Sequence, residues 1–544
     1  MKANVEEWAR RHTNFVAIII TLTGFLARLW AAHGTFLNPD EALHFRLASE
    51  ATLALAYRQS LTSLHPPLLI VLLHLWRALG TSDLWLRLPS VIGGTVFCWL
   101  FFKWLSQVAG GLAGLIGLLF VALLPPQIML GAEVRQYALL LAFLVASLYF
   151  VERAIAENSC GLMLASALFA SLGMLTHYSA FLFAAALGVY AVSKMLTRSP
   201  ERPQASVIGC WGAGQLAGLA LCFFLYKTHL SRHDFGSSQI YQGWMNYLGR
   251  SSYFEPGRDN PVLFAVGHSF GVFQFLFGQL AVGVVMGLVF LVGLALILRG
   301  RSLPGNAGSS RQLAILFVLP FALACAASFL HLYPYGGTRH IFFLTIPAMA
   351  GVSVAFASLS GKAEKRWGRA GAMAAVVVIL CLAFGKARRP TMDRADQSEA
   401  HMIAAIDFIQ TKVAPSDILY TDYQTELVLG RYLCHAGRIE PEPAPPMFEQ
   451  FSCGNRRVVS RDYRGWMFSA DNFMQEWQRL VGTYALTPGT RVWIVQARWG
   501  ATLPEDLKRE PQFQNLQFQA FGNNIKIFQI VVGKGVPEGA SNSG

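Results

Sequence analysis

The sequence predicts a polytopic α-helical membrane protein that carries a small C-terminal α/β domain. Of its 544 residues, 54% are hydrophobic and only 14% are charged, whereas soluble globular chains carry roughly a quarter charged residues. Residues 279–298 continue without one charge for the roughly 20 residues that a bilayer crossing needs. The mean hydropathy of +0.41 agrees with this. These observations argue against a soluble multidomain enzyme.

The net charge of +13 belongs to the membrane part of the chain. Residues 386–544 contain 18 Lys and Arg against 17 Asp and Glu, so almost all of the excess lies before residue 386. There, basic residues gather in loops between apolar stretches, at 194–202, 299–311 and 362–369. Cytosolic loops of membrane proteins are enriched in Lys and Arg. The charge therefore indicates topology, and no nucleic-acid partner is expected.

Eleven apolar segments are predicted to cross the membrane. With a cytosolic N-terminus the basic loops also fall inside, and an odd count places residues 386–544 outside. Residues 261–277 are apolar enough for a twelfth span, but that span would move two basic loops outside, so eleven is preferred. The predicted spans are residues 14–32, 84–104, 112–130, 136–153, 161–177, 179–196, 205–227, 278–298, 312–330, 341–359 and 371–385.

The first external loop, residues 33–83, is predicted to hold two helices that lie at the membrane interface, at 40–57 and 66–79. The second is too short to cross comfortably and contains His74 and Arg77, which favours an interfacial position.

The chain is predicted to divide into a membrane domain, residues 1–387, and a soluble domain, residues 388–544. In the soluble domain helical stretches alternate with β-rich runs, which is typical of a small α/β domain. Its Asp422 and Glu426 are interpreted as ordinary surface or core residues. The predicted helices are 397–412, 424–434, 471–484 and 504–510, and the predicted strands are 418–422, 457–461, 491–497 and 525–532.

Two of the eight cysteines, Cys434 and Cys453, lie in the soluble domain. A disulfide between them is expected if the domain is outside the cytosol, and two unrelated reduced cysteines are the alternative.

Polar residues gather at the external ends of the predicted spans. Ionisable groups at membrane depth are costly, yet five connections far apart in the sequence bring carboxylates, His, Tyr and Arg to one face. Taken singly, each has a structural explanation, such as an acidic first helical turn, a local ion pair or an aromatic belt. Their common side predicts a catalytic cavity at that interface. The residues are Asp40, Glu41, His65, Glu133, Arg135, Tyr137, His177, Tyr178, Arg339 and His340.

The sequence has no Asp-x-Asp pair, no Walker loop and no Cys-rich metal-ligand spacing. Neither a nucleotide-sugar enzyme nor an ATP-driven pump is favoured, and no metal site is predicted. What remains is a carboxylate suited to general-base work and cationic groups suited to a phosphate leaving group.

Several motifs, taken in order, resemble the integral-membrane glycosyltransferases of the GT-C superfamily. The resemblance covers roughly residues 14–360 and is strongest to the bacterial branch related to protein O-mannosyltransferases, aminoarabinose transferases and rhizobial-type core sugar transferases. The motifs are NPDE at 38–41, LHPPLLIVLLHLW at 64–76, SDLWLRLPSVIGG at 82–94, GAEVRQYAL at 131–139, THY at 176–178 and YPYGGTRHIFFLTIP at 333–347.

The resemblance implies a GT-C fold and a hexosyl- or pentosyltransferase that uses a polyprenyl-phosphate sugar donor. The sugar would pass to a glycan, lipid or protein acceptor on the extracytoplasmic face, with inversion and with Asp40 as general base. Glu41 would place the acceptor or tune Asp40. In this comparison His65, Arg339 and His340 face the donor phosphate, Glu133, Arg135 and Tyr137 shape the donor side, and His177 and Tyr178 line the cavity.

One departure from these relatives concerns His65, since they commonly have Lys at this position. A neutral imidazole would donate a single hydrogen bond to the phosphate. The expected location is the bacterial inner membrane, with the cavity and the soluble domain facing the periplasm. No cofactor is expected to be required, and a divalent cation is left open. The alternative function is a flippase or transporter of a polyprenyl-linked glycan without transferase activity.

Overall fold

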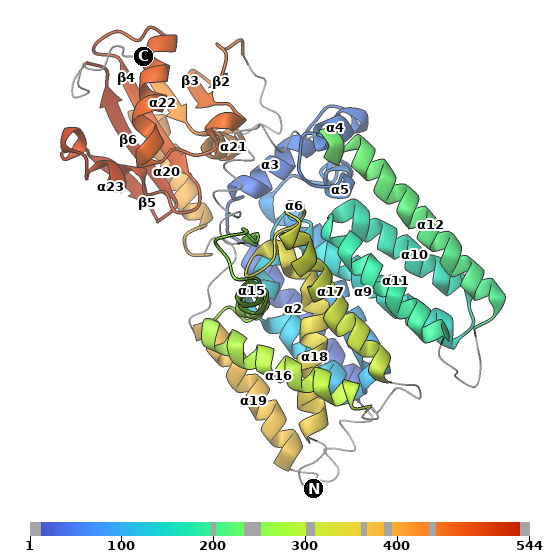
Figure 1. The fold of residues 1–544 in the computed structure, drawn as a ribbon. Coiled ribbons are helices and arrows are strands. Elements are labelled where there is room, and N and C mark those ends of the chain that lie inside the picture. Colours follow the sequence, from blue (N-terminus) through green and yellow to red (C-terminus); the bar gives the residue numbers. More distant parts are fainter. Residues whose placement is uncertain are drawn as a thin grey trace.

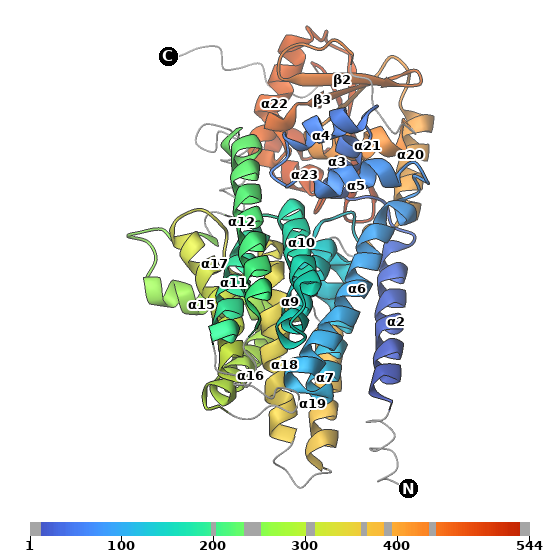
Figure 2. The ribbon, with the colours of Figure 1, turned by 90° about the vertical axis from the view of Figure 1, so that its right-hand side faces the viewer.

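The computed structural model describes residues 12–196, 203–232, 248, 252–300, 310–360, 367–385, 394–434 and 442–533. Helices form a bundle, and a separate sheet domain sits at one end of it (Figures 1 and 2). Helix α2 (Thr13–Ala32) starts at the end of the bundle opposite the sheet domain (Figure 2), as an odd number of crossings requires.

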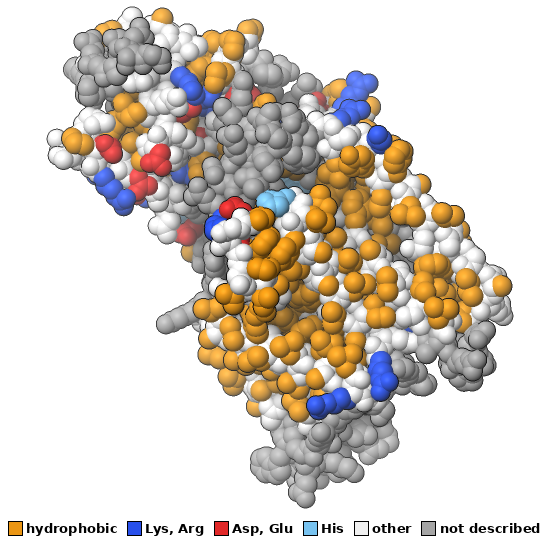
Figure 3. All heavy atoms as spheres, viewed as in Figure 1, with side chains coloured by type: hydrophobic (Ala, Val, Ile, Leu, Met, Phe, Trp, Pro, Cys, Tyr) orange, Lys and Arg blue, Asp and Glu red, His pale blue; other side chains and the backbone are white. Residues whose placement is uncertain are grey.

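Apolar helices make up the bundle, and seven of the described ones are long and apolar enough to cross a membrane. Large apolar side chains cover their surface, with Lys and Arg near the end away from the sheet domain (Figure 3). The chain is a multi-pass membrane protein. The bundle helices are α2 (Thr13–Ala32), α6 (Asp83–Ala109), α7 (Gly111–Leu123), α8 (Pro125–Leu130), α9 (Tyr137–Ala156), α10 (Cys160–Thr176), α11 (Ser179–Leu196), α12 (Ala205–Thr228), α15 (Pro261–Phe277), α16 (Leu280–Leu298), α17 (Leu313–Phe329), α18 (Thr345–Ser360) and α19 (Trp367–Gly385).

Each of the eleven predicted spans coincides with helix, but the third one is interrupted. Helix α7 ends at Leu123 and α8 begins at Pro125, because Pro125 and Pro126 cannot donate the hydrogen bonds that would continue α7. Helix α15, the segment considered for a twelfth span, is seen end-on in Figure 1 and from the side in Figure 2, so it runs across the bundle. The count of eleven stays a prediction.

Much of the predicted orientation rested on loops that lie outside the described residues, at 197–202, 301–309 and 361–366. The predicted domain boundary at residue 387 also lies outside them.

The first external loop holds three short helices, α3 (Pro39–Ala48), α4 (Leu53–Ser60) and α5 (Leu68–Trp76). The prediction of one helix over residues 40–57 was therefore wrong. Helix α3 ends before Ser49, and Thr52 starts α4 by accepting a hydrogen bond from the Leu55 amide. A polar residue that can cap a helix start favours a break over one continuous helix.

The C-terminal domain is a mixed six-stranded sheet with the strand order β2-β3-β1-β4-β6-β5. The central strand β1 runs parallel to β3 and β4, and the outer pairs are antiparallel. The elements are α20 (Glu399–Lys412), β1 (Ile418–Thr421), α21 (Tyr423–Tyr432), β2 (Phe448–Cys453), β3 (Arg456–Arg461), α22 (Ala470–Thr483), β4 (Arg491–Ala497), α23 (Leu503–Leu507), β5 (Phe518–Phe521) and β6 (Ile525–Val531).

The four predicted strands are confirmed, whereas β2 and β5 were missed. Both lie at the edges of the sheet, where half-exposed sequences such as FEQFSC and FQAF carry a weak alternating pattern. A disulfide joins Cys434, which follows α21, to Cys453 at the end of β2, so the predicted pairing is confirmed.

The C-terminal domain rests directly on the first external loop. One apolar cluster joins Phe36 and Phe45 of the loop to Leu427 and Val495 of the domain. Glu426 is a core residue, as the sequence allowed, and its buried carboxylate pairs with Arg46 of α3. Asp422 caps α21 by accepting from the Thr425 amide at 2.9 Å.

Candidate active site

The predicted polar residues converge at the end of the bundle that faces the C-terminal domain. In Figure 3, a histidine and both acidic and basic side chains reach the surface at this junction. Most are placed by connections between helices, because backbone outside regular helix lets side chains from distant segments approach one point. Arg339 and His340 stand in the short 3₁₀ segment η4 (Arg339–Leu344), which precedes α18.

Asp40 lies between two arginines. One oxygen, Oδ2, is 2.7 Å from Arg135 and 2.7 Å from Arg339. The Asp40 side chain is 11% exposed, and Arg339 at 23% is far more open than Arg135 at 3%. Burial would raise the pKa of Asp40, but the two guanidinium groups outweigh it and lower the pKa to about 2. Asp40 is therefore ionised at neutral pH.

Glu41 has a different environment, although it is the next residue. It is fully buried, and its carboxylate accepts from the Asn38 amide at 3.0 Å and the Val134 amide at 2.9 Å. Arg87 of α6 binds both oxygens, at 2.7 and 2.8 Å. With its oxygens occupied in this way, the buried Glu41 anchors the start of α3.

Four histidines from four segments form a column beside Asp40. The ring centroids are 5.7 Å apart for His44 and His65, 5.9 Å for His65 and His177, and 6.5 Å for His177 and His340. Burial, together with Arg135, lowers the pKa of His44 to about 4 and that of His177 to about 3, and it moves the pKa of His65 well below its usual value. The column is therefore neutral around pH 7 as long as no anion enters.

Glu133 and Tyr137 join the same cluster. Glu133 accepts a hydrogen bond from the Asn38 side chain at 3.0 Å. Burial and the nearby Glu41 raise the pKa of Glu133 well above its usual value, which favours its protonated form. The Tyr137 ring lies 5.5 Å from His177 and 5.5 Å from the Arg135 guanidinium.

Tyr178 is not brought into the column. Its ring packs against Phe181 of α11, at 5.9 Å, while the preceding His177 points toward His65.

Sequence reasoning missed two residues of this site, Arg87 and His44. Arg87 was visible as a charge inside a predicted span, which signals a buried partner. His44 stands four residues after Asp40, on the same face of α3, and its Nδ1 lies 2.6 Å from the Asp40 carbonyl oxygen.

Within the described ranges, no three His, Cys, Asp or Glu side chains are arranged to hold a metal ion. The expectation about cofactors stays a prediction.

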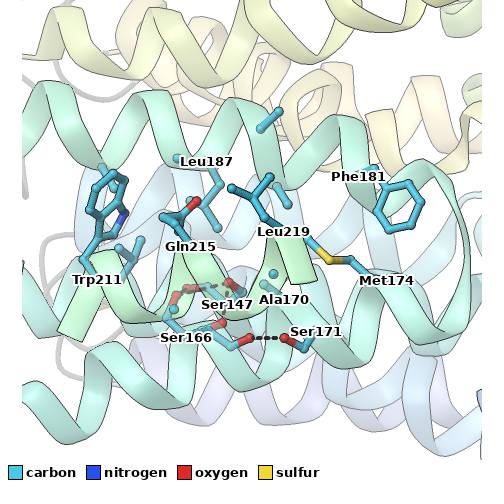
Figure 4. Close-up of a pocket in the computed structure, with 18 of the residues that line it drawn as sticks. Ser147, Ser166, Ala170, Ser171, Met174, Phe181, Leu187, Trp211, Gln215 and Leu219 are labelled. Atoms are coloured by element: carbon cyan, nitrogen blue, oxygen red, sulfur yellow. Dashed lines mark hydrogen bonds between the residues drawn. The ribbon is translucent and has the colours of Figure 1, made fainter. Parts of the chain in front are cut away.

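A separate cavity of about 150 Å³ lies among α9, α10, α11 and α12, away from Asp40. Figure 4 shows Trp211 and Gln215 beside it, with Ser147 and Ser166 bonded to each other. None of the described residues that line it is Asp, Glu, His, Lys or Arg. It offers no acid or base for catalysis, so the Asp40 cluster is the candidate active site.

The chain is similar to known proteins in part of its sequence and in its fold. Residues 64–226 match the family model described as dolichyl-phosphate-mannose-protein mannosyltransferase. The fold is similar to that of ArnT from Cupriavidus metallidurans bound to undecaprenyl phosphate, with a TM-score of 0.51 and 13% identity over 96% of this chain and 99% of that one. The chain has the GT-C fold.

The same enzyme in its apo state matches with a TM-score of 0.51, 12% identity and the same coverage. The oligosaccharyltransferase of Archaeoglobus fulgidus matches with a TM-score of 0.49 and 11% identity, over 90% of this chain and 70% of that one. A search of curated proteins gave no significant match. The GT-C fold and the matched segment confirm the resemblance that the sequence motifs indicated, and they support glycosyltransferase activity.

Proposed function

We propose that this protein transfers a sugar from a polyprenyl-phosphate-linked donor to an acceptor hydroxyl, with inversion at the anomeric carbon and with Asp40 as general base. The observation that carries the proposal is the position of Asp40, ionised and slightly open between Arg135 and Arg339. A carboxylate beside two guanidinium groups supplies both a proton acceptor and positive charge for a phosphate.

A polyprenyl-phosphate donor is supported by the nature of the similar proteins. The matched family model is named for dolichyl-phosphate-mannose, and the ArnT structure contains undecaprenyl phosphate. In this chain, Arg339 is the more exposed of the two arginines at Asp40. Guanidinium groups bind phosphate in a two-pronged geometry, so Arg339 is the group best placed to meet the donor. Arg135, Glu133 and Tyr137 would shape the donor side, with His65, His177 and His340 around them.

In the proposed reaction, Asp40 takes up the acceptor proton and the arginines offset the charge of the leaving phosphate. The acceptor oxygen forms a bond to the anomeric carbon and gives its proton to the Asp40 carboxylate. The bond from that carbon to the phosphate oxygen breaks, and its electron pair stays on the leaving polyprenyl phosphate, whose added charge the arginines offset. A carboxylate with a pKa of about 2 is a weak base. When Arg339 turns to the phosphate, Asp40 loses one cationic neighbour and becomes more basic.

The proposed location is the bacterial inner membrane, with the active site and the C-terminal domain on the periplasmic side. The disulfide between Cys434 and Cys453 supports this, since such bonds persist in oxidising compartments. The donated sugar is a hexose or a pentose, and the acceptor is a glycan, a lipid or a protein.

The test compares envelope glycolipids and glycans, by mass spectrometry, in cells that contain wild-type protein, Asp40→Asn or no protein. Loss of the same sugar in the last two would identify acceptor and base together. Asp407→Asn is the matched control, because Asp407 is exposed on α20 and its change should leave the glycan intact. Full glycan in the Asp40→Asn cells would show that the base is wrongly assigned.

A second arm separates transferase from flippase. Detergent extracts of those membranes, supplied with lipid-linked sugar from the same cells, should still transfer the sugar. A flippase would show no activity there, because detergent removes the bilayer across which it moves its substrate. Absence of wild-type transfer there would favour the flippase.

A further inference from the structure

The C-terminal end of helix α3, the helix that carries Asp40, is bound by ion pairs to the C-terminal domain. The Arg46 side chain, in the last turn of α3, lies 2.6 Å from Glu426 of α21 and 3.0 Å from Glu449 of β2. Glu426 is only 1% exposed, while Arg46 and Glu449 are about a third exposed, at 31% and 28%. An ion pair with one deeply buried partner resists separation, because breaking it leaves a buried charge without compensation.

The same domain also holds the chain just before α3. The Gln397 side chain donates to Glu41 at 3.1 Å, and the Gln397 carbonyl accepts from the Phe36 amide at 2.9 Å. The Leu37 amide donates to the Tyr432 hydroxyl at 2.6 Å. The C-terminal domain thus contacts α3 and its lead-in on both sides of Asp40.

The two carboxylates that hold Arg46 form one unit. Helix α21 supplies Glu426 and strand β2 supplies Glu449, and the Cys434–Cys453 disulfide ties the end of α21 to the end of β2. A shift of the domain would therefore move both carboxylates together and carry α3 with them.

We propose that the C-terminal domain sets the position of Asp40 in the active site, and that Arg46 is the positioning residue through which it does so. Arg46 lies six residues after Asp40, which is about 9 Å along a helix that rises 1.5 Å per residue. Arg135 and Arg339, which face Asp40, belong to other segments. A tilt of α3 about its Asn38 cap would hence move Asp40 relative to both arginines.

The consequence for the reaction is a rate effect with little change in donor binding. A misplacement of 1 Å in a catalytic group can cost about a hundredfold in rate. The donor would be held by groups outside α3, chiefly Arg339 and His65. This part of the inference rests on the proposed function, whereas the hold on α3 does not.

The test uses full-length protein in detergent and compares Arg46→Met with Arg491→Met. Arg491 also pairs with a buried carboxylate, Asp417 at 2.9 Å, but within the C-terminal domain, so its loss should not reach α3. Amide hydrogen exchange over residues 38–48 is expected to become about tenfold faster in Arg46→Met and to stay at the wild-type rate in Arg491→Met. Unchanged exchange in Arg46→Met would overturn the proposal.

The kinetic arm measures sugar transfer from lipid-linked donor by folded protein. Arg46→Met is expected to lower kcat by 10- to 100-fold while the affinity for undecaprenyl phosphate changes less than about threefold. A wild-type kcat in Arg46→Met would overturn the proposal. If wild-type protein shows no transfer while the exchange result holds, the proposed function fails and the hold on α3 stands.

Discussion

The two ends of the helical bundle bury carboxylates in different ways. At the end facing the C-terminal domain, Asp40 meets arginines from two distant segments and remains 11% exposed. Toward the other end, Glu152 of α9 meets Lys194 and Tyr190 of α11 and is 3% exposed. Lys194 and Tyr190 are four residues apart, so they project from one face of a single helix.

The difference distinguishes a functional from a structural ion pair. Glu152 links two neighbouring helices, and this packing is enough to explain it. The Asp40 cluster instead brings together charged side chains from several connections and leaves Asp40 and Arg339 partly exposed. Burying so many charges has a desolvation cost that helix packing alone does not require. Charged side chains that stay partly exposed at one end of the bundle are expected where a charged substrate must enter the protein.

The largest expected effect is the loss of sugar transfer when Asp40 is changed. Asp40→Asn should lower the transfer rate of the folded protein by about 10²- to 10⁴-fold, the usual contribution of a general base, and it should also lower stability because the buried Arg135 loses its partner. Glu152→Gln should leave the rate of the folded protein at the wild-type level, because Glu152 only joins helices. Transfer by purified protein and thermal unfolding in detergent measure both quantities. Equal rate losses in the two variants would remove the functional distinction.

The second effect concerns Glu41, which belongs to the Asp40 end but is structural in its contacts. Arg87→Met would leave this buried carboxylate without its ion-pair partner, and we expect it to lower the unfolding free energy by about 3–5 kcal/mol. Lys194→Met should cost less, because Lys194 is 17% exposed and water can reach it. Unfolding followed by intrinsic fluorescence in detergent gives both values. Near-equal stability of wild type and Arg87→Met would contradict the anchoring role of Glu41.

A smaller effect is a pH dependence that arises only at the Asp40 end. His44 and His177 have pKa values of about 4 and about 3 in the folded chain, because burial and Arg135 oppose their protonation. The unfolded chain binds protons near pH 6.5, so this stability is complete above pH 6.5 and is lost as the pH falls toward 4. Each histidine should cost about 2 kcal/mol between pH 6.5 and pH 5.

Thermal unfolding at pH 7.5, 6 and 5 checks this expectation. His44→Asn should show a smaller loss than wild type, whereas the change of the exposed His33 at the end of α2 to Asn should show the same loss. A loss of stability between pH 7.5 and pH 5 that is as large in His44→Asn as in wild type would contradict the buried histidine column.

The sequence was a good guide to which segments meet and a poor guide to what each side chain does there. The common side of five connections predicted that Asp40, Arg135 and Arg339 would lie together. It could not separate Asp40 from Glu41, since their difference comes from amides and Arg87, which only the folded chain supplies. Likewise, His177 and Tyr178 are adjacent but face different neighbours, because both lie in the short connection between the end of α10 at Thr176 and the start of α11 at Ser179.

Local signals also decided which elements were found. The four inner strands of the sheet contain β-branched residues and were predicted, whereas the edge strands β2 and β5 contain none and were not. In the first loop one helix was predicted across residues 49–52, but capping by Thr52 made two helices out of one.

The most direct test of the account is the affinity of the purified protein for undecaprenyl phosphate, measured by native mass spectrometry. Arg339→Gln should weaken binding by about 10- to 100-fold, the value of one hydrogen bond to a charged group. Lys194→Gln, at the other end of the bundle, should bind within about twofold of wild type. Equal affinity of Arg339→Gln and wild type would contradict a phosphate-binding site at Asp40.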